Sequence, residues 1–425
     1  MTTTQNNNVN LYQSTSTVTI YDLHIIGHDG KTWTLINQFA EVVLYEDLFG
    51  GLLSGSILVF DTMDYINRVP LDGWQQVVID FQTNSNANFQ RWKKTFRISK
   101  VSALERVANA SSTRSYLIEL ASEFFNGHLN TRIFQAYNSM TESAIVGSVC
   151  TNQLAVPSNQ QFIEATKYSR NFAVPGWKPL DVITECCQTA VRGSGYEAAN
   201  YVFYESLKGV HFTSLDSLAA QTPDPMPITN AVVTNLDITK AHVARRQAEE
   251  VHGQTHQNFV FNSMHGGFHT KMLGVDIYSK TFQEFDWDYK TEFPNLQKID
   301  SSGNLPYTSH PLPGKHQHMI VAPWQSTPRG YASDHSSRHV PKRASMMTQW
   351  GNASLNVHIT GDSSLFVGQK VLFKFPQSNA FVSNQAEDGM LSGSYIISAI
   401  RNHFDKTTHS QILNLRKGSL RKSAS

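Results

Sequence analysis

The tetrapeptides Ile98–Val101 (ISKV) and Ile397–Ile400 (ISAI) are two similar stretches at opposite ends of this chain of 425 residues. Each is followed by a second similar stretch, Ser115–Leu120 (SYLIEL) in the first case and Ser410–Leu415 (SQILNL) in the second. In both pairs apolar and polar residues alternate with period two, which is typical of half-buried antiparallel strands. The sequence therefore predicts two copies of one β unit.

The residues before these stretches follow the same order in both halves. Ile57 and Val59 precede Gly73 in the first half, while Leu355–Ile359 precedes Gly368 in the second, and a further alternating strand follows each glycine. The alternative to a duplication is that the two β regions are unrelated and look alike because strands generally resemble one another. A true duplication would let a trimer present six similar surfaces, so that its symmetry could match a sixfold partner.

Composition favours a protein that works inside an assembly. The formal net charge is +1, which gives no field to select nucleic acid or an acidic membrane. Charged residues make up 16% of the chain, whereas about 25% is typical. A surface with little charge is poorly protected against association, so we expect partners. A compositional bias of the lineage is the alternative.

The three cysteines, Cys150, Cys186 and Cys187, are too few for a disulfide framework. We expect them to be buried in the protein as small apolar residues, and the protein to reside in a reducing compartment. The N-terminus has no basic and apolar signal segment, and no run of 18 apolar residues exists to span a membrane. We therefore expect folding in a cytoplasm.

Changes of pattern along the chain divide it into six predicted parts. They are a polar arm (1–15), a first β tube domain (16–124), a small α+β domain (125–225), a second β tube domain (226–289 and 346–420), an irregular insertion (290–345) and a basic tail (421–425). The fold class is mainly β, with two similar antiparallel barrel-like tube domains and an α+β domain between them.

Several elements outside the repeats are predicted from local signals. Helices are expected over 140–150, with Thr141 as N-cap, and over 177–191, with Pro179 in the first turn. A hairpin is expected between 201 and 213. Beyond the proline-rich linker near 225, the pattern predicts a helix over 239–252 and alternating strands over 268–289.

Histidine pairs raise the question of a metal site. The pairs with suggestive spacing are His252 with His256, His265 with His269, His335 with His339, and His316 with His318. None has the glutamate of an HExxH motif or a nearby cysteine, so the interpretation is exposed or interface histidines that could make assembly pH-sensitive. We predict no metal, cofactor or catalytic residue.

Other candidate chemistry is weak. Asp286, Asp288 and Glu292 could form an acid–base site, but the alternation around Trp287 favours the solvated face of a strand. No phosphate-binding loop, dinucleotide motif or nucleophile elbow is present. The basic residues between 329 and 343, interleaved with Tyr331, favour a packing arm against another subunit over a nucleic-acid site.

The chain resembles the central baseplate hub proteins of contractile-tailed bacteriophages of the T-even type. Four groups of stretches, in family order, carry this resemblance. They are 44–49, 54–61 and 70–73; 174–181, 202–206 and 212–218; 269–272, 276, 280–282 and 288–289; and 361–362, 367–371 and 391–395. No recognised motif lies in 290–345.

The resemblance implies a structural homotrimer without catalysis. Its two tube domains per chain form a pseudo-sixfold ring that joins the sixfold tail tube to the threefold central spike and leaves a channel for DNA. The implied partners are the spike, tube or tube-initiator proteins, neighbouring baseplate proteins and the tape measure, with no sequence-specific nucleic acid. The implied location is the virion tail baseplate, assembled in the host cytoplasm.

Two alternatives remain open. A tail-associated cell-wall hydrolase would use the acidic cluster or the histidines. A spike–hub fusion of secretion machines would continue into an OB domain and a repetitive β-helix. No such repeat occurs up to Ser425, so we expect the spike to be a separate chain.

Overall fold

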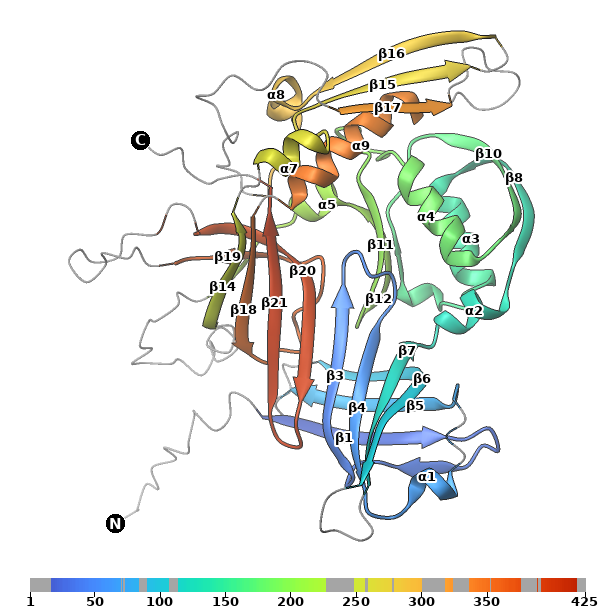
Figure 1. Ribbon diagram of the computed structural model, residues 1–425, viewed down its shortest axis with the longest axis vertical. Helices are drawn as coiled ribbons and strands as arrows, with labels where there is room; N and C mark the ends of the chain where they lie inside the picture. The colour runs from blue at the N-terminus through green and yellow to red at the C-terminus, as the bar shows by residue number, and fades with distance from the viewer. Residues whose placement is uncertain are drawn as a thin grey trace, which may run out of the picture.

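The computed structural model describes most of the chain. The described residues are 17–69, 71, 73–83, 90–106, 114–226, 248–256, 259–276, 279–299, 318–323, 336–351, 353–375, 388 and 391–418. The predicted polar arm and basic tail lie outside them, as does much of the predicted insertion. Figure 1 shows two groups of long strands side by side, a mixed α/β part beyond one end of them, and a smaller sheet with helices at the far end.

A 13-stranded sheet contains both groups of long strands. The first group is β1 (Val18–Ile26), β2 (Thr32–Thr34), β3 (Phe39–Asp47), β4 (Ser54–Asp61), β5 (Gln76–Thr83), β6 (Arg91–Arg106) and β7 (Arg114–Ser122), with the short helix α1 (Tyr65–Arg68). The second group is β13 (Asp224–Pro225), β14 (Ala248–His256), β18 (Ala353–Thr360), β19 (Lys370–Phe373), β20 (Gly393–Phe404) and β21 (His409–Lys417).

The two groups have the same strand order. Neighbouring strands run β3-β4-β7-β6-β5 in the first group and β14-β18-β21-β20-β19 in the second, and every pair in both series is antiparallel. The outer neighbours differ, because β1 pairs antiparallel with β5 while the two-residue β13 pairs parallel with β19. The predicted fold class, mainly β with two similar antiparallel units, is confirmed.

A serine bulge occurs at the same place in both copies. The register between β6 and β7 shifts at Ser99, and that between β20 and β21 shifts at Ser398. The Ser99 hydroxyl donates to the Glu119 carbonyl at 3.0 Å, and the Ser398 hydroxyl donates to the Asn414 carbonyl at 3.0 Å. Bulges are specific features that generic strand similarity does not reproduce, so this match supports a duplication.

The turn that leads into β5 or β19 is also repeated. The N–H of Trp74 (φ 67°) donates to the Ile98 carbonyl at 2.8 Å, and the N–H of Gly368 (φ 86°) donates to the Ile397 carbonyl at 2.9 Å. Both residues adopt the left-handed conformation, which is unusual for tryptophan. A Cβ on Gly368 would clash with the Tyr204 hydroxyl, so glycine is required in the second copy.

A further bulge aligns β3 with β14, the first strand of each five-strand series. The pairing of β3 with β4 shifts between Phe39 and Glu41, and that of β14 with β18 shifts between Ala248 and Glu250. Glu41 and Glu250 are therefore equivalent residues, and the residues that follow them correspond one to one up to the next bulge of β14.

One ladder, which we call the internal seam, joins the copies. Strand β20 of the second copy pairs antiparallel with β3 of the first, from Ala399 opposite Asp47 to Phe404 opposite Val42. The N–H of Leu48 extends it by donating to the Ser398 carbonyl at 2.8 Å. In Figure 1 the seam lies where the orange-red β20 runs beside the blue β3.

The chain has three apolar cores. One lies under the first copy (including Ile57 and Ile118), one under the second (including Val357 and Leu413), and one in the α+β part. The α+β part consists of α2 (Phe125–Asn130), β8 (Ile133–Thr141), α3 (Glu142–Asn152), β9 (Gln161–Ile163), β10 (Ser169–Trp177), α4 (Pro179–Thr189), β11 (Tyr201–Ser206), β12 (Gly209–Ser214) and α5 (Leu215–Ala219), with the single turn η1 (Ser158–Gln160).

The local signals in this α+β part are confirmed. The Thr141 hydroxyl accepts from the Ala144 N–H at 3.3 Å as the N-cap of α3, and Pro179 stands in the first turn of α4. Strands β11 and β12 form the expected antiparallel hairpin.

Two expectations need correction. The predicted helix over 239–252 is wrong where the structure describes it, because Ala248–His256 is strand β14. The stretch 290–345, expected to be irregular, contains described helix and strand. The elements there and just before are α7 (Phe259–Met264), β15 (His269–Asp276), β16 (Thr281–Asp288), α8 (Tyr289–Glu292), η3 (Phe293–Asn295), β17 (His318–Pro323) and α9 (Ser336–Trp350). Strands β15, β16 and β17 form a sheet of their own, apart from the second copy.

No helix among the described residues is long and apolar enough to cross a membrane.

The three cysteines lie buried in α3 and α4 with free thiols. Burial raises the pKa of Cys150, Cys186 and Cys187 to about 12 each. At pH 8 we therefore expect Ellman's reagent to modify none of them in the folded protein and all three after denaturation, since the thiolate is the reactive form. A thiol that reacts within minutes in the folded protein would contradict this burial.

Candidate functional site: strand edges and the polar face of the sheet

Among the strand edges that lack a partner within the described residues, such as the short end strand β2, two are equivalent to the strands of the internal seam. Strand β14 pairs on one side only, with β18, and the Lys100–Arg106 part of β6 pairs only with β7. Their equivalents in the other copy, β3 and the Ala399–Phe404 part of β20, are the two sides of the internal seam. The chain thus carries one complete seam and the separate halves of a second.

One face of the sheet around the internal seam is buried and the other is exposed. Val42 and Leu44 of β3 point into the core, whereas Tyr45 between β20 and β4 is exposed. On the exposed face, the His403 Nε2 lies 2.9 Å from a Glu41 carboxylate oxygen. The acidic residues Glu41 and Asp47 interrupt this polar face, so it offers no continuous basic track for nucleic acid.

The polar face brings together three potential metal ligands. Glu250 and His252 are two residues apart on β14, and His358 on β18 lies directly opposite Glu250. One ligand atom from each lies within 4.8 Å of the others. The His252 Nε2 is 3.4 Å from Glu250 Oε2, and the two imidazole centroids are 5.9 Å apart.

Of the histidine pairs singled out by spacing, only one member, His252, joins this cluster. His316 and His335 lie outside the described residues, and so does the side chain of His256. His339 is buried in α9. Sequence spacing missed His358 because it lies on a neighbouring strand.

The acidic cluster has structural roles. Asp288 caps α8 by accepting from the N–H groups of Lys290 and Thr291 at 2.8 and 3.4 Å. Glu292 accepts from the Tyr196 hydroxyl at 3.0 Å. Asp286 is exposed on β16 beside the buried Trp287, which is the alternation expected of a solvated strand face.

Basic residues of α9 pack within the chain. Lys342 donates to the Glu197 carbonyl and lies 3.8 Å from the ring centroid of Tyr196. Burial lowers the pKa of Lys342 to about 8. Arg343 donates to the carbonyls of Ala199 and Tyr201, at 3.1 Å each. These two residues therefore contact the α+β part of the same chain; Arg329 and Tyr331 lie outside the described residues.

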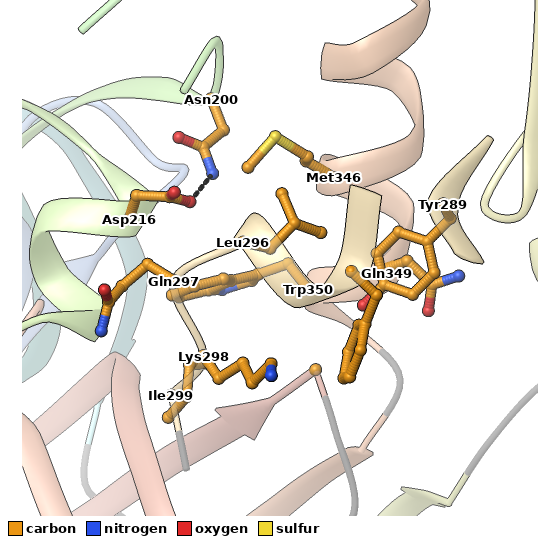
Figure 2. Close-up of a pocket in the computed structure, with 12 residues that line it drawn as sticks. Asn200, Asp216, Tyr289, Leu296, Gln297, Lys298, Ile299, Met346, Gln349 and Trp350 are labelled. Carbon is orange, nitrogen blue, oxygen red and sulfur yellow. Dashed lines mark hydrogen bonds between the residues drawn. The ribbon is translucent and has the colours of Figure 1, made fainter. Parts of the chain in front are cut away.

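A small pocket lies where α5, α9 and the segment after α8 meet (Figure 2). Asn200 donates to Asp216 at 3.0 Å within it, and burial raises the pKa of Asp216. The other lining residues are mostly apolar or amide side chains. Asp286, Asp288 and Glu292 do not line this pocket, so it offers no paired carboxylates for hydrolysis.

Comparison with known proteins gives no match to any protein-family model or curated protein sequence. Solved structures do match. The 43 kDa tail protein of prophage MuSo2 from Shewanella oneidensis has a TM-score of 0.55 at 8% identity, over 93% of this chain and 98% of that chain. A tail protein from Neisseria meningitidis MC58 has a TM-score of 0.54 at 8% identity, over 93% and 96%. The chain therefore has a fold found in phage tail proteins, which agrees with the resemblance drawn from the sequence.

Proposed function

We propose that this chain is a structural hub of a phage-type tail baseplate. Three copies form a ring with pseudo-sixfold symmetry that joins a sixfold tail tube to a threefold central spike. The observation that supports this most is the duplicated sheet, in which one seam is complete and the halves of an equivalent seam remain unpaired, on the end strand β14 and on the Lys100–Arg106 part of β6.

Closure of the ring follows from these edges. Strand β14 of one protomer pairs with the Lys100–Arg106 edge of the next, as β3 pairs with Ala399–Phe404 inside each chain. Three internal and three external seams then alternate around the ring. This arrangement leaves neither edge exposed, and exposed edges otherwise invite uncontrolled strand pairing.

The polar face of the ring lines a channel that DNA crosses during ejection. Acidic side chains such as Glu41 lie on that face beside the imidazole of His403, which suits passage without a specific grip. The proposed partners are the spike, the tube or its initiator, neighbouring baseplate proteins and the tape measure. The proposed location is the virion tail, with assembly in the host cytoplasm.

We propose no catalytic role, because Asp288 and Glu292 serve a helix cap and a hydrogen bond to Tyr196. Zymography on host peptidoglycan tests this proposal against the hydrolase alternative. We expect no clearing by the isolated chain. Clearing that Asp288→Asn abolishes would show an enzyme instead.

Sedimentation analysis tests the ring directly. We expect the purified chain to form a species of three times the chain mass of 47.7 kDa, because two copies per chain close a six-unit ring with three chains. A strictly monomeric species at concentrations used for assembly would contradict the proposal, and so would a hexamer, since it would hold twelve units.

A further inference from the structure

We propose that Glu250, His252 and His358 bind a divalent transition-metal ion, best represented by zinc, and that Glu105 of the neighbouring protomer completes the site. The three-residue part of the site uses residues of one chain and does not depend on the proposed ring. The contribution of Glu105 rests on the proposed ring.

The ligand set within one chain fits zinc. Two imidazoles and one carboxylate are nitrogen and oxygen ligands of the kind that zinc prefers, whereas calcium and magnesium favour sites made of oxygen alone. Ligand atoms of a tetrahedral zinc ion lie about 3.3 Å apart, since each is about 2.0–2.1 Å from the metal. The three atoms here already lie within 4.8 Å of one another, so small rotations of exposed side chains suffice.

The strands hold these side chains in a fixed relation. Glu250 and His358 are directly opposite in the antiparallel ladder of β14 and β18, and His252 is on the same face two residues along. Strand β18 is itself paired with β21 on its other side. The backbone of the site is therefore part of the sheet and needs no ordering when metal binds.

The external seam would place Glu105 beside this site. In the internal seam, His403 of β20 lies opposite Val43, and on its other side it lies opposite Ser410. Glu105 of β6 lies opposite Ser115, which is the first-copy equivalent of Ser410. Glu105 is therefore the equivalent of His403 in its ladder position, although β6 contains one extra residue between Ser102 and Glu105 that β20 lacks.

The same transfer identifies the residue that would face Glu105. His252 is the equivalent of Val43, because each stands two residues after the glutamate, Glu250 or Glu41, that follows the shared bulge. Glu105 of one protomer thus lies opposite His252 of the next and on the same face.

Charge gives a separate reason for a cation at the external seam. In the internal seam, Glu41 pairs with the imidazole of His403 at 2.9 Å. In the external seam the equivalent positions are Glu250 and Glu105, so a second carboxylate replaces the imidazole. Two carboxylates and two histidines around one divalent ion form a four-ligand site that balances this charge.

Calorimetric titration of tag-free protein with zinc chloride alone tests the three-residue site. We expect one ion per chain in the wild type. Either His252→Asn or His358→Asn should weaken zinc binding at least about tenfold. Changes to residues that only support the ligands already weaken binding by about that factor, so loss of a ligand should cost no less. The matched control is His28→Asn, an exposed turn histidine far from the cluster, which should leave binding unchanged. No zinc binding by the wild type, or binding that survives both variants, would overturn the proposal.

Glu105→Gln tests the contribution of the neighbour. We expect at least about tenfold weaker zinc binding by the trimer, and an unchanged affinity would overturn the role of Glu105 while leaving the three-residue site. Sedimentation of the same samples separates the two proposals. A trimer without zinc binding overturns the metal site and keeps the ring, whereas a zinc-binding monomer keeps the three-residue site and overturns both the ring and the role of Glu105.

Discussion

Cysteines placed at Glu105 and His252 should link neighbouring protomers by disulfides. Oxidation of the double variant Glu105→Cys, His252→Cys should convert most of the protein into covalent dimers and trimers on non-reducing gels. In an antiparallel ladder, residues directly opposite each other have Cα atoms about 4.5–5.5 Å apart, which falls within the roughly 4.4–6.8 Å that a disulfide spans. The native cysteines should not interfere, because their thiols are buried.

The internal seam provides a matched positive control. His403→Cys with Val43→Cys places the same two ladder positions opposite each other within one chain. This variant should form an intrachain disulfide, visible as a mobility shift without dimers or trimers. It shows that the position, the oxidant and the backbone geometry permit the bond.

A register control makes the cross-linking decisive. Lys100 is equivalent to Ala399, which lies four ladder positions from His403. Lys100→Cys with His252→Cys should therefore link poorly, because the two sites are displaced by about 13 Å at roughly 3.3 Å per residue. If the internal pair links and the Glu105 pair does not, the external seam is wrong. Equal linking at both registers would show random collision between strand edges.

The duplicated strands could be predicted from the sequence because their signal is local. Each strand alternates between a buried and an exposed face, as in Ile57 and Val59 against the core, and period-two patterns record that directly. The Thr141 cap and the Pro179 first turn were predictable for the same reason, since each depends on neighbours within a few residues.

Helix α9 was missed because its buried face is largely polar. His339, Lys342, Ser345 and Gln349 are all buried at helical spacing, and the hydroxyl of Ser345 and the amide of Gln349 both donate to the Gly267 carbonyl at 2.8 Å. Met346 and Trp350 are the buried apolar pair at the end of the helix, which is too short a stripe to reveal it, and Pro341 inside it suggests a break.

Strand β14 was mistaken for a helix because alanine and glutamate around 248–250 favour helices locally. Its conformation depends on pairing with β18, which begins about a hundred residues later, at Ala353. The same separation hid the cluster of His252 with His358. The alignment of the two copies did contain a usable signal, since Glu250 occupies the place of Glu41.

Replacing Glu46 with glutamine should stabilise the protein at alkaline pH and have little effect near pH 5. Glu46 is the penultimate residue of β3 and lies at the junction of the two copies with the β11–β12 hairpin. Its carboxylate accepts from the Leu207 N–H at 3.3 Å and from the Asn402 amide at 3.4 Å. Complete burial raises the pKa of Glu46 from 4.5 to about 7, although the hydrogen bond from the Leu207 N–H and, to a lesser degree, the charge of Lys94 oppose that rise.

The direction of the pH effect follows from this raised pKa. Between pH 4.5 and about 7 the folded protein retains a proton on Glu46 that the unfolded chain releases, so the free energy of unfolding falls as pH rises through this window. A shift of about 2.5 pKa units corresponds to about 3 kcal/mol at 1.36 kcal/mol per unit. Glutamine keeps the shape and the hydrogen-bonding capacity of the neutral acid, so Glu46→Gln should remove this loss.

Thermal unfolding at pH 5 and pH 8.5, at one protein concentration and scan rate, measures the effect. The unfolding midpoint of Glu46→Gln should match the wild type at pH 5 and exceed it by roughly 3–4 °C at pH 8.5, given about 2.1 cal/mol/K per residue for a chain that unfolds as a unit. The matched control is Glu119→Gln, which removes a partly exposed carboxylate that pairs with Lys100 at 3.0 Å; it should shift the midpoint little at either pH, because exposed pairs contribute little. A lower midpoint for Glu46→Gln at pH 8.5 would mean that Glu46 stabilises the junction as a carboxylate, with its hydrogen bonds and Lys94 together outweighing the effect of burial.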